Sequence, residues 1–109
     1  MKIPTSFCLH GITYTVCIDP ELKAREDSIG ETRYRDDCVL LQPSVSKFQS
    51  QTRMEQTFCH ELVHAILYEM HSDLRTNEVF VDNFACLLHQ YMVSTQEVTD
   101  ARPISPLPF

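Results

Sequence analysis

The chain has 109 residues, of which 43% are hydrophobic and 22% are charged, and its formal net charge at pH 7 is −6. This composition is ordinary for one globular domain and excludes a long low-complexity chain. The acidic balance and the lack of a Lys/Arg cluster argue against direct binding to nucleic acid. No apolar run approaches the roughly 20 residues that cross a bilayer, and a signal-peptide core is lacking, so we expect a cytoplasmic protein without a membrane partner.

The first part of the chain predicts two β-hairpins. Residues 6–18 are rich in β-branched and aromatic types and are divided by a turn at Gly11. Residues 30–42 repeat this arrangement, with a turn at the Asp-Asp pair that ends with Asp37. The segment 21–28 between them is polar and charged, and its pattern does not decide between a short helix and a loop.

Two helices are predicted to follow the hairpins. Apolar residues recur at spacings of three and four from Ser50 to Met70, which is the period of an amphipathic helix. Either Ser46 or Ser50 could cap its first turn. A second helical period begins after Asn77, another capping residue, and runs to about Val93. The apolar residues that form this period are Phe80, Phe84, Leu87, Leu88 and Tyr91. The expected fold class is therefore α+β, with a small antiparallel sheet of two hairpins packed on two helices.

The end of the chain is expected to lie outside this domain. Residues 1–100 form the predicted single domain, and residues 101–109 form a Pro-rich tail. Each proline removes a backbone donor and fixes its own φ, so neither a helix nor a central strand is expected there. The prolines of the tail are Pro103, Pro106 and Pro108.

The five cysteines do not suggest a framework of disulfides. Their number is odd, and no two of them have CxxC spacing, which also disfavours a cysteine-based zinc site. We expect most of them to be reduced thiols in the core. They are Cys8, Cys17, Cys38, Cys59 and Cys86.

A histidine pair with metal-binding spacing lies inside the first predicted helix, in the sequence HELVH from His60 to His64. Residues four apart share one face of a helix, with Cβ atoms about 5 to 6 Å apart, so both imidazoles can bind one ion. Zinc accepts histidine nitrogens and keeps a position open for water when it has three protein ligands. Glu61 is close enough to take a proton from that water without being a ligand. The alternative is two ordinary histidines on a helix.

Two acids at the start of the second helix could complete the site. Glu78 and Asp82 are four residues apart and share a face. Glu78 can supply a third ligand oxygen, and Asp82 can accept the second ring N–H of His60 or His64 and so orient that ring. Two alternatives stay open: Asp82 is the ligand and Glu78 a bystander, or both are acids on a solvated face.

Residues 57–67 (TFCHELVHAIL) and 80–90 (FVDNFACLLHQ) resemble the compact ImmA/IrrE-like metallopeptidases and their small phage and prophage relatives. The spacing of Glu78 and Asp82 also resembles that of the gluzincins typified by thermolysin. The resemblance implies a minimal zincin core and a zinc ion bound by His60, His64 and Glu78. It also implies that Asp82 orients the first histidine.

These residues predict a zinc-dependent hydrolase with Glu61 as general base. The resemblance implies a peptidase that acts on a protein or peptide partner, such as a phage or host regulator. Two other classes stay open: a zinc-stabilised, non-catalytic protein-binding module, and a metal-free interaction protein. Outside the motif, His71 is expected to be an ordinary polar helix end and His89 a core or interface histidine. Nothing in the sequence selects a tyrosine that would polarise the substrate carbonyl.

Overall fold

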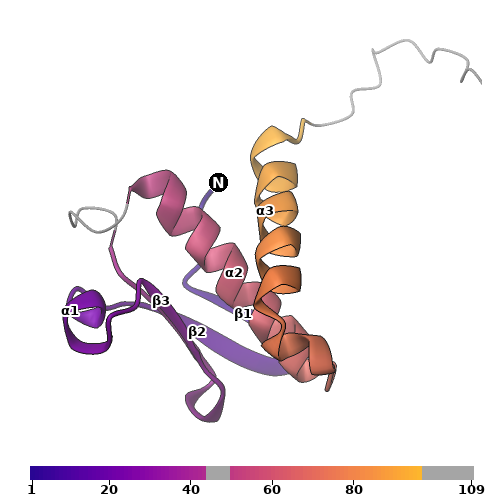
Figure 1. Ribbon diagram of the computed structural model, residues 1–109, viewed down its shortest axis with the longest axis horizontal. Coiled ribbons are helices and arrows are strands. Elements are labelled where there is room, and N and C mark those ends of the chain that lie inside the picture. Colours follow the sequence, from indigo (N-terminus) through magenta and orange to yellow (C-terminus); the bar gives the residue numbers. More distant parts are fainter. Residues whose placement is uncertain (44–49, 97–109) are drawn as a thin grey trace, which may run out of the picture.

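The computed structural model describes residues 1–43 and 50–96, which form an α+β fold of a four-stranded sheet and three α-helices (Figure 1). The strands are β1 (Ser6–Leu9), β2 (Ile12–Ile18), β3 (Gly30–Arg33) and β4 (Cys38–Leu41). The helices are α1 (Leu22–Glu26), α2 (Gln51–Glu69) and α3 (Glu78–Ser94), with short 3-10 helices η1 (Tyr34–Asp36) and η2 (Asp73–Thr76). Ser46 and the Pro-rich tail lie outside the described residues, so the predictions made for them stay predictions.

Both predicted hairpins are confirmed, but the sheet that they form is mixed rather than antiparallel. β1 pairs antiparallel with β2, and β3 pairs antiparallel with β4, while a parallel pairing of β2 with β4 joins the hairpins. The order β1-β2-β4-β3 places β1 and β3 at the edges. The first hairpin turns through His10 and Gly11, whose φ angles are 51° and 78°, as a two-residue turn that matches the strand twist requires. Turn residues fix each hairpin locally, whereas the join between them depends on long-range packing.

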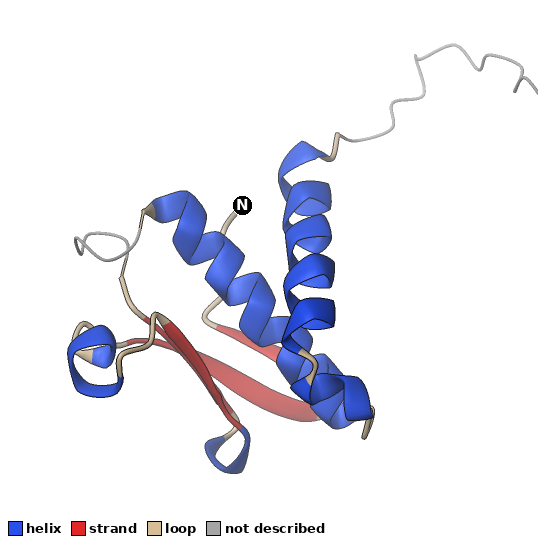
Figure 2. Ribbon diagram, in the orientation of Figure 1, coloured by secondary structure: helices blue, strands red, loops and turns tan. Residues whose placement is uncertain are grey.

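The helix α2 lies against the sheet, and α3 packs beside α2 (Figure 2). Of the two expected caps, Ser50 is in place: its Oγ accepts a hydrogen bond from the Arg53 N–H at 3.2 Å. The main core is formed by side chains of β4, α2 and α3, which pack into one cluster. Its buried members are Val39, Leu41, Met54, Phe58, Cys59, Val63, Leu67, Val81 and Ala85.

The helix α3 is confirmed, with Asn77 as its cap, but its buried face differs from the expected one. Because α3 packs mainly on one neighbour, α2, it buries only a narrow strip of residues spaced four apart. The strip consists of Val81, Ala85 and His89. Large apolar side chains of the expected face are exposed instead: Phe84, Leu87 and Tyr91. No helix of the described segments has both the length and the apolar character of a membrane span.

All five cysteines are free, as expected, but the expected burial is found only for Cys59. Cys17 and Cys38 are partly buried, and Cys8 and Cys86 are exposed. Burial raises the pKa of Cys59 to about 11, so this thiol stays protonated at neutral pH.

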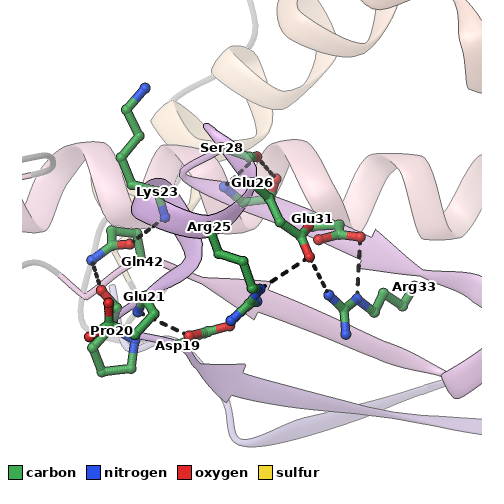
Figure 3. Close-up of polar contacts among 11 residues, drawn as sticks. Asp19, Pro20, Glu21, Lys23, Arg25, Glu26, Ser28, Glu31, Arg33 and Gln42 are labelled. Carbon is green, nitrogen blue, oxygen red and sulfur yellow. Dashed lines mark hydrogen bonds and ion pairs between the residues drawn. The ribbon is translucent and has the colours of Figure 1, made fainter.

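Polar contacts tie α1 to the edge strand β3 (Figure 3). Arg25 forms ion pairs with Asp19 and Glu26, and Arg33 forms ion pairs with Glu26 and Glu31. These side chains are partly exposed, so the pairs contribute little to overall stability. Their effect is positional, because they hold the segment that leads into β3.

Gln42, which follows β4, provides the buried part of these contacts. Its side chain is 1% exposed, accepts a hydrogen bond from the Lys23 N–H at 2.8 Å and donates one to the Pro20 carbonyl at 2.9 Å.

We predict that Gln42→Leu lowers the free energy of unfolding by about 1–3 kcal/mol, because it leaves both backbone groups without these partners. Urea titration measures the change. The same substitution at exposed Gln90 is the control and should cost less than about 0.5 kcal/mol. Equal losses at both positions would refute the prediction.

Candidate metal centre

His60 and His64 lie one turn apart on α2 and bring their Nε2 atoms to 3.1 Å from each other. The other nitrogen of each ring already has a partner. Asp82 Oδ1 lies 2.7 Å from His60 Nδ1, and the Arg75 carbonyl oxygen lies 2.9 Å from His64 Nδ1. Because both partners are acceptors, each Nδ1 carries a proton, so that in the neutral form of each ring Nε2 has a free lone pair. Both lone pairs therefore face one point.

Glu78, the first residue of α3, brings its carboxylate to the same point. Its Oε2 lies 3.2 Å from His60 Nε2, and its Oε1 lies 3.1 Å from His64 Nε2. A tetrahedral zinc ion with ligand bonds of about 2.0–2.2 Å holds neighbouring ligand atoms about 3.3–3.5 Å apart. The three side chains thus fit such an ion with small shifts.

A cation at the centre of this cluster would stabilise its charges. Two nitrogen lone pairs and a carboxylate repel one another at separations of 3.1 to 3.2 Å unless positive charge lies among them. Protons on both rings would instead place two cations in contact. One metal ion could instead bind the ligand atoms of His60, His64 and Glu78 together.

Glu61 lies beside the cluster but is turned into the protein, with only 8% of its surface exposed. Thr32 of β3 donates a hydrogen bond from Oγ1 to Glu61 Oε1 at 2.8 Å. Burial raises the pKa of Glu61, while the hydrogen bond from Thr32 and the nearby His60 and His64 oppose this shift. The edge strand therefore fixes the carboxylate that the sequence predicts to be a general base.

Gly30 allows this close approach of β3 to α2. A Cβ atom at this position would lie 2.4 Å from Thr57 Cγ2 and 3.3 Å from Glu61 Cγ. A larger residue would force Thr57 or the strand to shift and would crowd Glu61. The absence of a side chain at Gly30 is thus part of how Glu61 is positioned.

The structure places the sequence-derived site residues together and adds two that the sequence did not suggest, Thr32 and the Arg75 carbonyl. A backbone carbonyl has no sequence signal, and the strand pattern does not tell which helix Thr32 faces. His71 is exposed at the end of α2, with φ of 55°, and does not join the cluster. His89 is 6% exposed and its Nε2 lies 3.1 Å from Glu55 Oε1, so it links α3 to α2 as a core histidine.

The sequence does not choose among Tyr34, Tyr68 and Tyr91, and the structure places Tyr34 near the charges of the site. Its ring stacks on Tyr68, with centroids 4.2 Å apart and planes 14° apart. Burial raises the pKa of Tyr34, and the charges of Glu61 and Glu78 add to the shift. Tyr91, in contrast, is exposed on α3.

A cleft of about 410 Å³ opens beside the candidate metal centre. Its walls come from the segment before β3, from α2 and from α3. His60, Glu61 and Asp82 line it, together with Gly30 and Arg53. A cavity of this size can hold part of an extended peptide next to Glu61.

The fold and the site together define the class of the protein. A helix with HExxH spacing, two converging imidazoles and a carboxylate from the next helix, next to a small sheet, is the arrangement of a zincin-like metalloprotein. Residues 7–101 match the SprT-like family, so the chain belongs to this family, which is zincin-like and related to metallopeptidases. The match spans every residue of the candidate centre. No curated protein and no solved structure matches the chain.

Proposed function

We propose that this SprT-like chain is a zinc-dependent hydrolase, and specifically a peptidase, whose zinc ion is bound by His60, His64 and Glu78. The observation that carries the proposal is the convergence of three ligand atoms whose histidines both have Nδ1 engaged elsewhere. The family match supports it, because the family is related to metallopeptidases. We include Zn²⁺ in the proposal because its preferred ligands and bond lengths agree with this set.

When bound, zinc would act as a Lewis acid and lower the pKa of a bound water toward about 7. Glu61 would accept a proton from the attacking water and return it to the leaving amine nitrogen. Thr32 holds one oxygen of Glu61 and leaves the other to receive the proton. Asp82 and the Arg75 carbonyl would keep the two histidines in the tautomer that binds metal.

The main alternative to a catalytic zinc site is a structural zinc site in a non-catalytic module. Structural zinc sites are closed by four protein ligands, whereas catalytic sites keep one position open. Within the described segments the ligand group has three members, and the Glu78 and Asp82 side chains are 62% and 65% exposed. A solvent-accessible group of three ligands favours the catalytic alternative.

The substrate class belongs to the same proposal. The cleft beside Glu61 suits a peptide, and the resemblance of the two helices to ImmA/IrrE-like metallopeptidases extends the proposal to a protein regulator of the phage or prophage kind. We further propose that the protein acts in the cytoplasm and that neither nucleic acid nor a membrane is a direct partner. The net charge of −6 supports the part of this proposal that concerns nucleic acid.

Metal analysis combined with peptide cleavage tests the proposal. Protein purified without added metal should contain about one zinc ion per chain, as a site with one set of three ligands requires. It should cleave members of a proteome-derived peptide library, detected by mass spectrometry. Zinc-stripped protein should be inactive until zinc is restored. If the purified protein contains no zinc, the proposed metal centre is refuted. If it contains stoichiometric zinc but cleaves no peptide, the result favours the non-catalytic zinc module.

A further inference from the structure

Arg53 is a cation within the cleft beside the metal centre. It lies on α2, seven residues before His60, and its side chain lines the same cleft as His60, Glu61 and Asp82. It is the one Lys or Arg among the described residues that line this cleft. The lining also includes two acids, Glu61 and Asp82, toward its other end. Arg53 therefore gives one end of the cleft a charge opposite to that of the other end.

Arg53 has no carboxylate partner among the residues that the structure describes. Lys23, Arg25 and Arg33, by comparison, each pair with at least one acid. The Arg53 side chain is exposed, in the first turn of α2, where no acidic residue accompanies it. A cation is unfavourable there, because the helix dipole places partial positive charge at this end. A bound carboxylate would relieve this repulsion.

The chemistry of the guanidinium defines what it would bind. Its planar set of donors matches the two oxygens of a carboxylate and can bind both at once. The seven residues of α2 from Arg53 to His60 span about 10 Å, which is about the length of three residues of an extended chain. A peptide with its scissile bond beside Glu61 can thus bring a group about three residues away to Arg53.

We propose that Arg53 forms a carboxylate-binding subsite at the end of the cleft and selects substrates with an acidic group about three residues from the scissile bond. The inference rests on the proposed peptidase function, because it assumes that the scissile bond of the substrate lies beside Glu61. The carboxylate belongs either to an Asp or Glu side chain or to the free C-terminus of a short peptide. The two sources share one chemistry, and an experiment can separate them.

A binding experiment tests the subsite without requiring cleavage. Zinc-loaded Glu61→Gln protein is immobilised and offered a nine-residue peptide library, once with free and once with amidated C-termini. Retained peptides should be enriched about 3- to 10-fold in Asp and Glu over Asn and Gln, as expected for a partly exposed charge-assisted pair. If the C-terminus is the source, free acids should instead be enriched over amides by a similar factor.

Variants at Arg53 decide whether this residue causes the enrichment. Arg53→Gln, made in the same Glu61→Gln protein, should remove it, and Arg53→Glu should favour Lys and Arg peptides instead. Arg35→Gln removes an exposed arginine outside the cleft and should leave the enrichment intact.

Acidic enrichment that survives Arg53→Gln, or retention without any preference for a carboxylate, overturns the subsite alone. Failure to retain any peptide overturns both the subsite and the cleft as a peptide site. Failure of wild-type protein to cleave peptides would count against the proposed function but not against binding at Arg53.

Discussion

The substitution Glu61→Gln is expected to abolish hydrolysis while the zinc content and the unfolding midpoint stay nearly unchanged. A glutamine has the shape of the glutamate, and its carbonyl oxygen can still accept the hydrogen bond that Thr32 donates to Oε1 at 2.8 Å. It cannot accept a proton from water at neutral pH. General acid–base catalysis contributes about 10²- to 10⁴-fold to rates, so we expect kcat to fall by at least about 10²-fold. Initial rates on the best-cleaved library peptide, with elemental analysis of the same samples, measure this effect.

The matched control for this prediction is Glu21→Gln, which makes the same chemical change at an exposed position before α1. Its rate should equal that of the wild type. Loss of zinc or of the folded state in Glu61→Gln would show that Glu61 is a structural residue. A rate above about a tenth of the wild-type value would remove Glu61 from the role of general base.

The parts of the site that the sequence could predict are those set by helix geometry. A spacing of four residues places His60 beside His64, and the same rule places Glu78 and Asp82 on one face. In the structure Glu78 lies against both histidines, and Asp82 lies against His60. The functional roles of these residues stay predictions that the variants test.

The rest depends on contacts between segments far apart in the chain. The parallel pairing of β2 with β4 joins the second hairpin to the first, and neither hairpin sequence predicts this pairing. This sheet places Thr32 against Glu61, 29 residues later in the chain. The buried strip of α3 was also missed, because the sequence shows which residues are apolar but not how much of the helix a neighbour covers.

The substitution Glu78→Ala is expected to remove most of the zinc-dependent stability of the protein. It deletes one of three proposed ligands and removes the carboxylate that faces the Nε2 atoms of both imidazoles. Loss of a residue that merely orients a ligand costs 10- to 100-fold in metal affinity, so loss of a ligand should cost more than about 10²-fold. A ligand present at 100 times its Kd stabilises the folded state by about 2.7 kcal/mol. We therefore expect this amount of zinc-linked stabilisation to vanish at zinc concentrations that saturate the wild type.

Competition titrations with a chelating dye give the affinities, and thermal unfolding with and without zinc gives the linked stability. The metal-free forms of both proteins provide the reference, so a direct effect of the alanine on α3 is subtracted. Asp82→Asn is the graded comparison: the amide oxygen can still accept from His60 Nδ1, which lies 2.7 Å from Asp82 Oδ1, but the negative charge is lost. Its affinity should fall by about 10- to 100-fold, less than that of Glu78→Ala. The reverse order would make Asp82 the ligand and Glu78 the bystander, because only a direct metal bond can outweigh the loss of an orienting charge.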